Sequence, residues 1–340
     1  MKTAVVILNF NGRKHLETYL PSVVAYSNPH TIIVADNAST DDSVAFLKEK
    51  YPDIRLLHNN ENHGFAKGYN DALAQIQGEF DNYVLLNSDV EVTPDWIEPL
   101  IHCFSDEKVV SVQPKILAHL NKNTFEHAGA AGGFLDENYF PFCRGRIFDF
   151  CEKDNGQYDF IEEVTWTSGA CMLIRANAFH EANGFDNDFF AHMEEIDLCV
   201  RLQKKGYKLV CQPQSTVFHL GGGTLPYNSP NKIYLNFRNN LFLIVKNHQG
   251  LLFPKLFFRM ALDGIAAFKF LSEGKFSFFW KIFLAHMALY GNFGKMYQKR
   301  RQLKAQQGKI LFYNGSILWA YFGKKIKVFK DLNQRKFYEK

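Results

Sequence analysis

Apolar runs alternate with segments of helical periodicity between Thr3 and Leu117. Buried strands are predicted by the runs TAVVILNF, TIIVADN, DIRLLHN, NYVLLNSD and VVSVQPKIL, and amphipathic helices by the segments between them. Parallel strands read as continuous apolar runs because helices cover both faces of their sheet. The pattern therefore predicts an α/β fold with a Rossmann-like, mostly parallel central sheet flanked by helices.

The alternation is lost in residues 119–163, where glycines and aromatic residues are frequent. We expect loops and short strands there, placed to wall a pocket. Regular periodicity returns with a strand and a helix in EVTWTSGACMLIRANAFHEANGF, a helix in MEEIDLCVRLQKKG and a strand in YKLVCQPQSTVFHL. We therefore assign residues 1–240 to one α/β domain.

Residues 241–340 differ from this domain in composition and in charge. They contain 19 lysines and arginines but 4 aspartates and glutamates, a net charge of +15, whereas residues 1–240 contain 20 and 31, a net charge of −11. Phenylalanine and leucine are also frequent in the basic region. Within residues 251–304 the longest uncharged stretch, Ile282 to Gly294, is shorter than the ~18 residues that a membrane-spanning helix needs.

Alternating apolar runs and cations in this region predict amphipathic helices that lie on an anionic membrane surface. Two alternatives stay open, namely a helical subdomain packed on the rest of the chain and a homodimer interface. No nucleic-acid-binding motif accompanies the basic charge, so nucleic acid is not predicted as a partner. The short N-terminal apolar run is unlike a signal peptide, and the six cysteines form no C-x-x-C pair, which favours a cytoplasmic protein.

Candidate ligand-binding residues follow three of the predicted strands, at the edge where open α/β sheets bind ligands. They are Asn9, Phe10, Asn11, Asp36, Asn87, Ser88 and Asp89. No G-x-G-x-x-G turn and no P-loop lysine follows the first strand, so dinucleotide or ATP binding through those loops is not expected. A carboxylate such as Asp36 suits a ribose hydroxyl or a base N–H. Asp89 suits a hard divalent cation that bridges two phosphates, although a strand followed by a simple helix cap is the alternative.

A second acidic cluster, Glu194, Glu195 and Asp197, opens a predicted helix after the apolar segment FFAHM. A solvated helix start, favoured by the helix dipole, is one interpretation. A catalytic site is the other, because desolvation beside apolar side chains raises the pKa of a carboxylate toward that of a useful general base. His219 follows a predicted strand and precedes three glycines, and both a structural and a ligand-binding role stay open for it.

Seven motifs occur in the order seen in family 2 glycosyltransferases, namely VVILNFNG, VADNASTDDS, NHGFAKGYN, LLNSDVEVTPDWI, TSGACMLIR, MEEIDLCVR and FHLGGGTL. Residues 1–240 resemble this family, and its bacterial rhamnosyltransferase-like branch in particular. The resemblance implies a GT-A fold, a nucleoside-diphosphate sugar donor, a divalent metal and inversion at the sugar carbon. Single-sugar transfer is favoured, because the Q-x-x-R-W motif of processive polymer synthases is absent from the sequence.

The resemblance also implies roles for individual residues. The NSD sequence at residues 87–89 matches the D-x-D motif, so Asp89 would bind Mg²⁺ or Mn²⁺, although the first position of the motif holds asparagine. His219 matches a position that completes the metal site in some relatives. Glu195 matches the catalytic base, and Glu194 stays an alternative because the family has aspartate at the position of Glu195.

Further residues are implied to surround the donor and acceptor. The nucleotide-binding set is Asn9, Phe10, Asn11, Asp36, Lys67, Asn87 and Ser88, and the donor and acceptor pocket is formed by Trp166, Ser168, Gly169 and Ala170. Asp36 matches the family's nucleotide-binding aspartate, and residues 9–11 match the loop around the base.

The resemblance thus implies a metal-dependent hexosyltransferase that acts in cell-surface polysaccharide synthesis. It would move one sugar from a UDP- or dTDP-sugar, with dTDP-rhamnose as one candidate, to a saccharide or lipid-linked acceptor. We expect a peripheral protein on the inner face of the plasma membrane. A sugar nucleotidyltransferase is an alternative, but its Gly-rich phosphate loop is poorly matched by LNFNGRKH. A catalytically inactive glycan-binding or scaffold protein is another, opposed by the retained Asp89, Glu195 and His219.

Overall fold

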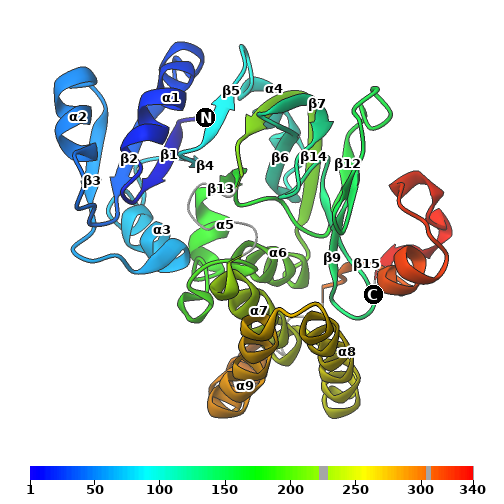
Figure 1. Cartoon of the computed structure of the whole chain (residues 1–340). Helices are drawn as coiled ribbons and strands as arrows, with labels where there is room; N and C mark the ends of the chain where they lie inside the picture. The colour runs from blue at the N-terminus through cyan, green and yellow to red at the C-terminus, as the bar shows by residue number, and fades with distance from the viewer. Residues whose placement is uncertain (222–228, 304–307, 340) are drawn as a thin grey trace.

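The computed structural model describes residues 1–221, 229–303 and 308–339. Its main feature is a large mixed sheet at the centre of the molecule (Figure 1). The strand order is β12 (Glu162–Glu163), β14 (Lys208–His219), β6 (Val109–Ala118), β13 (Cys171–Arg175), β4 (Asn82–Asn87), β1 (Thr3–Asn9), β2 (Thr31–Asp36) and β3 (Arg55–His58). Strands β4, β1, β2 and β3 are parallel neighbours, whereas β13 runs antiparallel between β4 and β6. Two short strands, β5 (Val90–Val92) and β7 (Asn121–Phe125), extend the sheet by pairing with β14 and β6.

Helices cover both faces of this sheet, as the apolar pattern predicted. They are α1 (Arg13–Tyr26), α2 (Ser43–Lys50), α3 (Gly64–Ala74), α4 (Glu98–His102), α5 (Ala176–Glu181) and α6 (Glu194–Lys204). Side chains alternate between the faces, so that Val5 and Ile7 of β1 share a core with α1, whereas Ala4 and Val6 share another with α3. Each core strand is therefore buried on both sides, which explains its continuous apolar sequence.

A second, four-stranded antiparallel sheet lies in the stretch that the sequence predicted to hold loops and short strands. It consists of β8 (Gly133–Leu135), β9 (Pro141–Cys143), β10 (Arg146–Ile147) and β11 (Phe150–Cys151). The two-stranded antiparallel sheet of β15 (Leu311–Tyr313) and β16 (Phe337–Glu339) packs on it, with the centre of the Phe337 ring 5.0 Å from that of Phe134. The end of the chain therefore returns to the core and does not continue as amphipathic helix.

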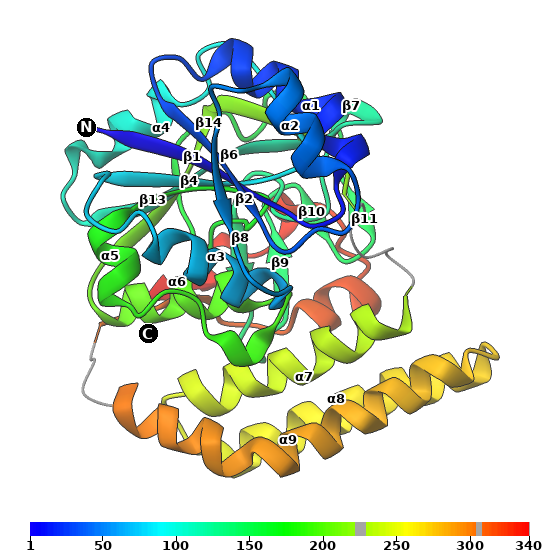
Figure 2. The same cartoon turned by 90° about the vertical axis from the view of Figure 1, so that its left-hand side faces the viewer.

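Three longer helices form a layer of their own, namely α7 (Pro230–Asn247), α8 (Leu252–Ser272) and α9 (Phe276–Leu303). Helix α7 packs against α6, α8 and α9, and the last two lie on the side of α7 away from the central sheet (Figures 1 and 2). Residue 240, the expected boundary, lies inside α7, so the division into residues 1–240 and 241–340 stays a prediction. Among the helices that the structure describes, none has the length and apolarity to cross a bilayer.

Candidate active site

The carboxyl ends of β1 and β2 hold a connected set of polar side chains. The Asn9 amide donates to Asp36 Oδ1 (3.2 Å) and to Ser39 Oγ (3.1 Å), and Asp36 Oδ2 accepts the Ser39 backbone N–H (3.0 Å). Asn9 and Asp36 lie opposite each other in the strand register, and both are buried. Asn11 Oδ1 accepts the Thr40 N–H at 2.7 Å. The structure thus brings together three of the residues predicted to hold the nucleotide.

Two other residues predicted to bind the nucleotide, Phe10 and Lys67, lie outside this hydrogen-bonded set. Phe10 is an exposed side chain that follows β1. Lys67 lies on α3 and donates to both carboxylate oxygens of Asp71, at 2.6 and 2.8 Å. Binding of a phosphate by Lys67 would therefore require this half-buried ion pair to open.

Asp89 and His219 meet where β5 pairs with the end of β14. His219 Nε2 lies 3.1 Å from Asp89 Oδ1, and His219 Nδ1 lies 3.3 Å from Glu126 Oε2. The contact follows from the strand register, in which His219 pairs with Val90. All three polar side chains are buried. The sequence pointed to Asp89 and His219 but not to Glu126, which lies in the stretch without periodicity.

These contacts set the protonation state of the cluster. Burial lowers the pKa of His219, but the contacts with Asp89 and Glu126 and their negative charges outweigh it and raise the pKa to about 10. Burial raises the pKa of Asp89, but the hydrogen bond and the charge of His219 lower it overall. These directions favour an imidazolium form of His219 paired with the Asp89 carboxylate when no ligand is bound.

The segment that enters β13 is held firmly by the core. Trp166 is buried, and its indole N–H donates to the Phe134 carbonyl at 3.0 Å. The Ser168 N–H donates to Gln113 Oε1 at 3.0 Å, and its hydroxyl donates to the Ala128 carbonyl. These side chains fix the backbone of the predicted donor and acceptor pocket, and the ring of Trp166 faces the interior.

Gly169 and Ala170 connect the predicted metal loop to the acidic helix. The Asn87 N–H donates to the Ala170 carbonyl at 3.0 Å. A Cβ atom placed on Gly169 would lie 3.8 Å from Cβ of Glu195 and 3.4 Å from the Phe65 ring. The residues predicted for the metal loop, the pocket and the base are therefore neighbours at one edge of the sheet, although they come from distant parts of the sequence.

Glu194 and Glu195 are the first residues of α6, and their carboxylates are largely shielded from solvent. Glu194 is buried and Glu195 half-buried, and Oε2 of each has no hydrogen-bond partner among the described residues. Burial and the charge of Glu195 raise the pKa of Glu194 well above its usual range. Burial raises the pKa of Glu195 to about 7, against backbone N–H groups that lower it. Such a carboxylate suits proton abstraction near neutral pH, and the partly exposed Glu195 is the better placed to meet a ligand.

The loop before α6 has an unusual backbone that α7 stabilises. Phe190, His192 and Met193 adopt positive φ angles of 64°, 69° and 72°. Each such conformation costs ~1–3 kcal/mol, so surrounding contacts must compensate for it. The buried amide of Asn239 donates to three carbonyls of the loop at 2.9, 2.9 and 2.7 Å, and the Phe190 carbonyl accepts two N–H groups at the start of α3. Asn239 therefore fixes the direction in which α6 leaves the loop.

Asn239→Asp is expected to destabilise the protein by about 1–3 kcal/mol. The aspartate keeps the shape of the side chain but removes both N–H donors and turns a carboxylate toward carbonyl oxygens. Urea unfolding would measure the loss. Asn292→Asp on α9 is the matched control, because its amide donates to a single carbonyl (Ala288, 2.8 Å) at a half-buried site. Equal effects of the two substitutions would contradict the role given to Asn239.

The family of this chain is shown by a comparison with protein-family models. The model described as "Glycosyl transferase family 2" matches residues 4–181. The chain belongs to glycosyltransferase family 2. The match runs from β1 to α5, so it includes the polar edge around Asp36 and Asp89 and ends before Glu194.

Two rhamnosyltransferases are among the relatives of this glycosyltransferase. N-acetylglucosaminyl-diphospho-decaprenol L-rhamnosyltransferase of Mycobacterium tuberculosis is 26% identical over 261 residues, which cover 72% of this chain and 85% of the relative. Rhamnosyltransferase WbbL of Escherichia coli is 24% identical over 222 residues, which cover 63% of this chain and 82% of the relative. The resemblance to rhamnosyltransferase-like members of the family is thereby confirmed.

Two solved structures share the fold of this glycosyltransferase. GalNAc-T7 with UDP, GalNAc and Mn²⁺ superposes with a TM-score of 0.56 at 18% identity, over 72% of this chain and 48% of that one. The mannosyltransferase PcManGT of Pyrobaculum calidifontis with GDP-Man and Mn²⁺ superposes with a TM-score of 0.51 at 15% identity, over 90% and 85%. The GT-A fold expected from the sequence is confirmed.

The Asp89 and His219 side chains could supply two ligands to a divalent cation, and the remaining ligands would have to come from elsewhere. Within the described ranges no three histidine, cysteine or acidic side chains are placed to hold one ion together. The reason is visible in the cluster, because Asp89 and Glu126 touch opposite nitrogens of the imidazole ring. Mg²⁺ and Mn²⁺ sites of transferases commonly combine one or two protein ligands with water and substrate phosphates. Glu126 would then hold the second ring nitrogen of His219, as carboxylates behind metal-bound histidines do.

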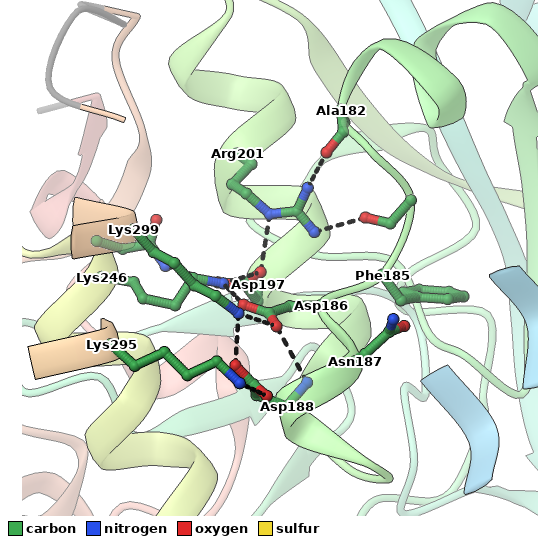
Figure 3. A network of polar contacts seen from close by, with 12 residues as sticks. Ala182, Phe185, Asp186, Asn187, Asp188, Asp197, Arg201, Lys246, Lys295 and Lys299 are labelled. Atoms are coloured by element: carbon green, nitrogen blue, oxygen red, sulfur yellow. Dashed lines mark hydrogen bonds and ion pairs between the residues drawn. The ribbon is translucent and has the colours of Figure 1, made fainter. Parts of the chain in front are cut away.

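Three aspartates of this glycosyltransferase, one on α6 and two in the segment before it, form ion pairs with lysines of the helical layer (Figure 3). Asp197 of α6 accepts from Lys246 of α7 at 2.8 Å, and Lys246 also contacts Asp186 at 2.5 Å. Lys299 of α9 bridges Asp186 and Asp188 at 2.5 and 2.6 Å. Asp197, which the sequence analysis grouped with the two glutamates, therefore belongs to this ion-pair network.

The FHLGGGTL motif is only partly described by the structure. Its last two glycines lie outside the described residues.

Proposed function

We propose that the protein transfers one sugar, with inversion, from a nucleoside-diphosphate sugar to a saccharide or lipid-linked acceptor in cell-surface polysaccharide synthesis. The observation that carries this proposal is the run of neighbouring positions that begins with the Asn9–Asp36 hydrogen bond, crosses from β1 to β4 through the pairing of Leu8 with Asn87, and reaches Glu195 by way of Ala170 and Gly169. It supports the assignment of a nucleotide-binding part, a cation-binding part and a catalytic base to one edge of the sheet. The names of the two rhamnosyltransferase relatives support dTDP-rhamnose as the first donor to test, with UDP-sugars next.

In the proposed reaction Glu195 accepts the proton of an acceptor hydroxyl. The oxygen attacks the anomeric carbon as the bond from that carbon to the diphosphate breaks, so one displacement gives inversion without a covalent intermediate. The carboxylate suits this step because its Oε2 has no hydrogen-bond partner among the described residues and burial raises its pKa to about 7. Glu194, more deeply buried, stays the alternative base.

The nucleoside diphosphate, which is the leaving group, is assigned to the part of the sheet edge away from Glu195. Asp36, Asn9 and Asn11 would hold the nucleoside through groups that already form a hydrogen-bonded frame. Asp89 and His219 would hold Mg²⁺ or Mn²⁺, which would supply positive charge beside the leaving diphosphate. Ser168 and Gly169 would face the donor sugar and the acceptor.

We place the reaction at the inner face of the plasma membrane, with the protein as a peripheral component. The support is the decaprenol-linked substrate named for the mycobacterial relative. A screen of dTDP-, UDP- and GDP-sugars by thermal shift with Mn²⁺, followed by transfer to lipid-linked saccharides, would test the proposal. Release of pyrophosphate from a nucleoside triphosphate and a sugar phosphate would instead identify a sugar nucleotidyltransferase. Binding of a glycan without donor hydrolysis or transfer would identify an inactive scaffold.

A further inference from the structure

Helix α8 buries an ion pair together with three apolar residues, Leu252, Leu256 and Ala267, and leaves most of its large aromatic side chains outside. Two of its buried residues, Arg259 and Asp263, form an ion pair at 3.0 Å, and His286 of α9 lies 3.4 Å from Asp263. Arg259 also donates to Asn240 of α7. The opposite side exposes Phe253, Phe257, Phe258, Ile265, Phe268 and Leu271. A helix that packs on a soluble core usually carries polar residues on its outer side, whereas the outer side of α8 carries these six large apolar residues.

Helix α9 and a π-helical turn, Trp319–Gly323, extend this apolar surface. The Lys269 ammonium of α8 lies 5.9 Å from the ring centre of Phe322, which places the turn beside the end of α8. Exposed apolar residues of these two segments are Phe276, Trp280, Phe283, Met287, Tyr290, Tyr297, Trp319 and Phe322. We call them, with the six residues of α8, the outer aromatic surface. Soluble monomers rarely leave so much aromatic surface uncovered.

The charge beside the outer aromatic surface indicates what covers it. Lys269 and Lys275 are exposed where α8 turns into α9 and share one acidic partner, Glu273, and Lys324 and Lys325 follow the π-helical turn, so cations outnumber acids there. Aromatic side chains next to cations are typical of helices that lie in the headgroup region of an anionic bilayer, with tryptophan at the boundary. A twofold dimer through the same surface would bring identical lysines toward each other.

We propose that the outer aromatic surface lies on an anionic lipid bilayer, with α8 and α9 parallel to the membrane plane. Both helices lie on the side of α7 away from the central sheet, where a flat surface can reach them (Figures 1 and 2). This inference rests on the proposed function, because a lipid-linked acceptor is found only at a membrane and would explain why the protein binds one. Vesicle binding needs no sugar donor, so its failure is distinct from a failure of the transferase assignment.

Tryptophan fluorescence of the full chain would test the contact directly. Of the four tryptophans, Trp96 and Trp166 are buried, whereas Trp280 and Trp319 are exposed by 46% and 64%. Vesicles of phosphatidylcholine with phosphatidylglycerol should shift the emission to shorter wavelength, and brominated lipids should quench it. Trp280→Phe and Trp319→Phe should each remove part of the shift. High salt should weaken binding without abolishing it, because the aromatic contribution is insensitive to salt.

A double substitution on α8 distinguishes vesicle binding by the outer aromatic surface from nonspecific binding by any exposed apolar residue. Phe257 and Phe268 are 78% and 66% exposed, so Phe257→Ser with Phe268→Ser should leave the fold intact. Co-sedimentation with the anionic vesicles should fall about tenfold or more. The matched control is Leu120→Ser with Phe160→Ser, two exposed apolar residues outside the surface, and it should bind as the unchanged chain does.

Three results would overturn the proposal. The first is a full chain that ignores anionic vesicles at low salt, and the second is equal sedimentation of the α8 variant and its control. The third is a dimer in light scattering that the α8 substitutions dissociate, since a second copy of the chain would then cover the surface. Thermal unfolding of each variant, measured alongside, shows whether the fold is retained, and Phe257→Ser alone replaces the pair if it is not.

Discussion

Glutamine in place of Glu195 is expected to lower the rate of sugar transfer by about 10²–10⁴-fold while donor affinity stays unchanged. The amide has nearly the same shape as the carboxylate but cannot accept the acceptor proton, and the base is needed only in the chemical step. Product formation under saturating donor gives kcat, and calorimetry with the nucleotide sugar gives the Kd. A Glu195→Gln protein that transfers at the normal rate would show that another group is the base.

The pH dependence gives a second measure of the same group. Burial raises the pKa of Glu195 to about 7, so its ionised fraction falls as the pH falls through 7. The rate of the unchanged chain should therefore decline below about pH 7, and Glu195→Gln should lack that decline. Glu194→Gln is the matched control, one residue away on the same helix. If it proves the more damaging change, the base is Glu194.

Asparagine in place of Asp89 is expected to weaken metal-dependent donor binding by about 100-fold or more. Asp89 is the carboxylate that contacts His219 Nε2, and asparagine keeps its size while removing the negative charge that an Mg²⁺ or Mn²⁺ ion requires. Calorimetry with the nucleotide sugar, with Mn²⁺ and then with a chelator, would separate the metal-dependent part of the affinity. Only that part should be lost.

A carboxylate close by provides the control for Asp89. Glu91, two residues further on β5, contacts His119 at 3.0 Å and Lys122 at 2.7 Å and is not part of the buried cluster. Glu91→Gln should leave metal-dependent binding within about twofold, since exposed ion pairs contribute little. Unchanged binding by Asp89→Asn, or equal losses in the two variants, would remove Asp89 from the proposed metal site.

The alternation of strands and helices was predictable because burial on both faces leaves a continuous apolar run in each central strand. The place of β13 was not. It inserts antiparallel between β4 and β6, and this order depends on pairings such as Leu173 with Val84 and Val112, which join distant segments. A pattern read along the chain reports which face a residue buries and carries no information about which strand is its neighbour.

Part of the candidate site was predictable for a related reason. Asp36 and Asp89 follow apolar strands, where a carboxylate stands out, and the structure places both at the expected edge, while their roles stay predictions. Glu126 was missed because it lies in a stretch where no periodicity identifies a strand end. An acid followed by His127 and glycines in an apolar surrounding was the available signal.

The orientation of α8 could not be read from composition. Cations and aromatic residues were evident, but either set could have faced inward. The deciding fact is the Arg259–Asp263 pair, whose partners come from α7 and α9, so only the assembled layer shows that the aromatic side is left outside. The i, i+4 spacing of the pair was the one hint in the sequence.

The aspartate–lysine network determines whether the region after residue 240 can be separated from the rest of the chain. A chain cut after residue 240 would lose Lys246 and Lys299 and would leave Asp186 and Asp197 buried without these cations. Removing one partner of a buried ion pair costs about 3–5 kcal/mol, a large part of the stability of a typical domain. The helices beyond that point are therefore no appendage that recombination could exchange between related enzymes. A transplanted tail would have to bring its lysines in register with the recipient's aspartates, and a recipient without those aspartates would receive buried, unpaired cations.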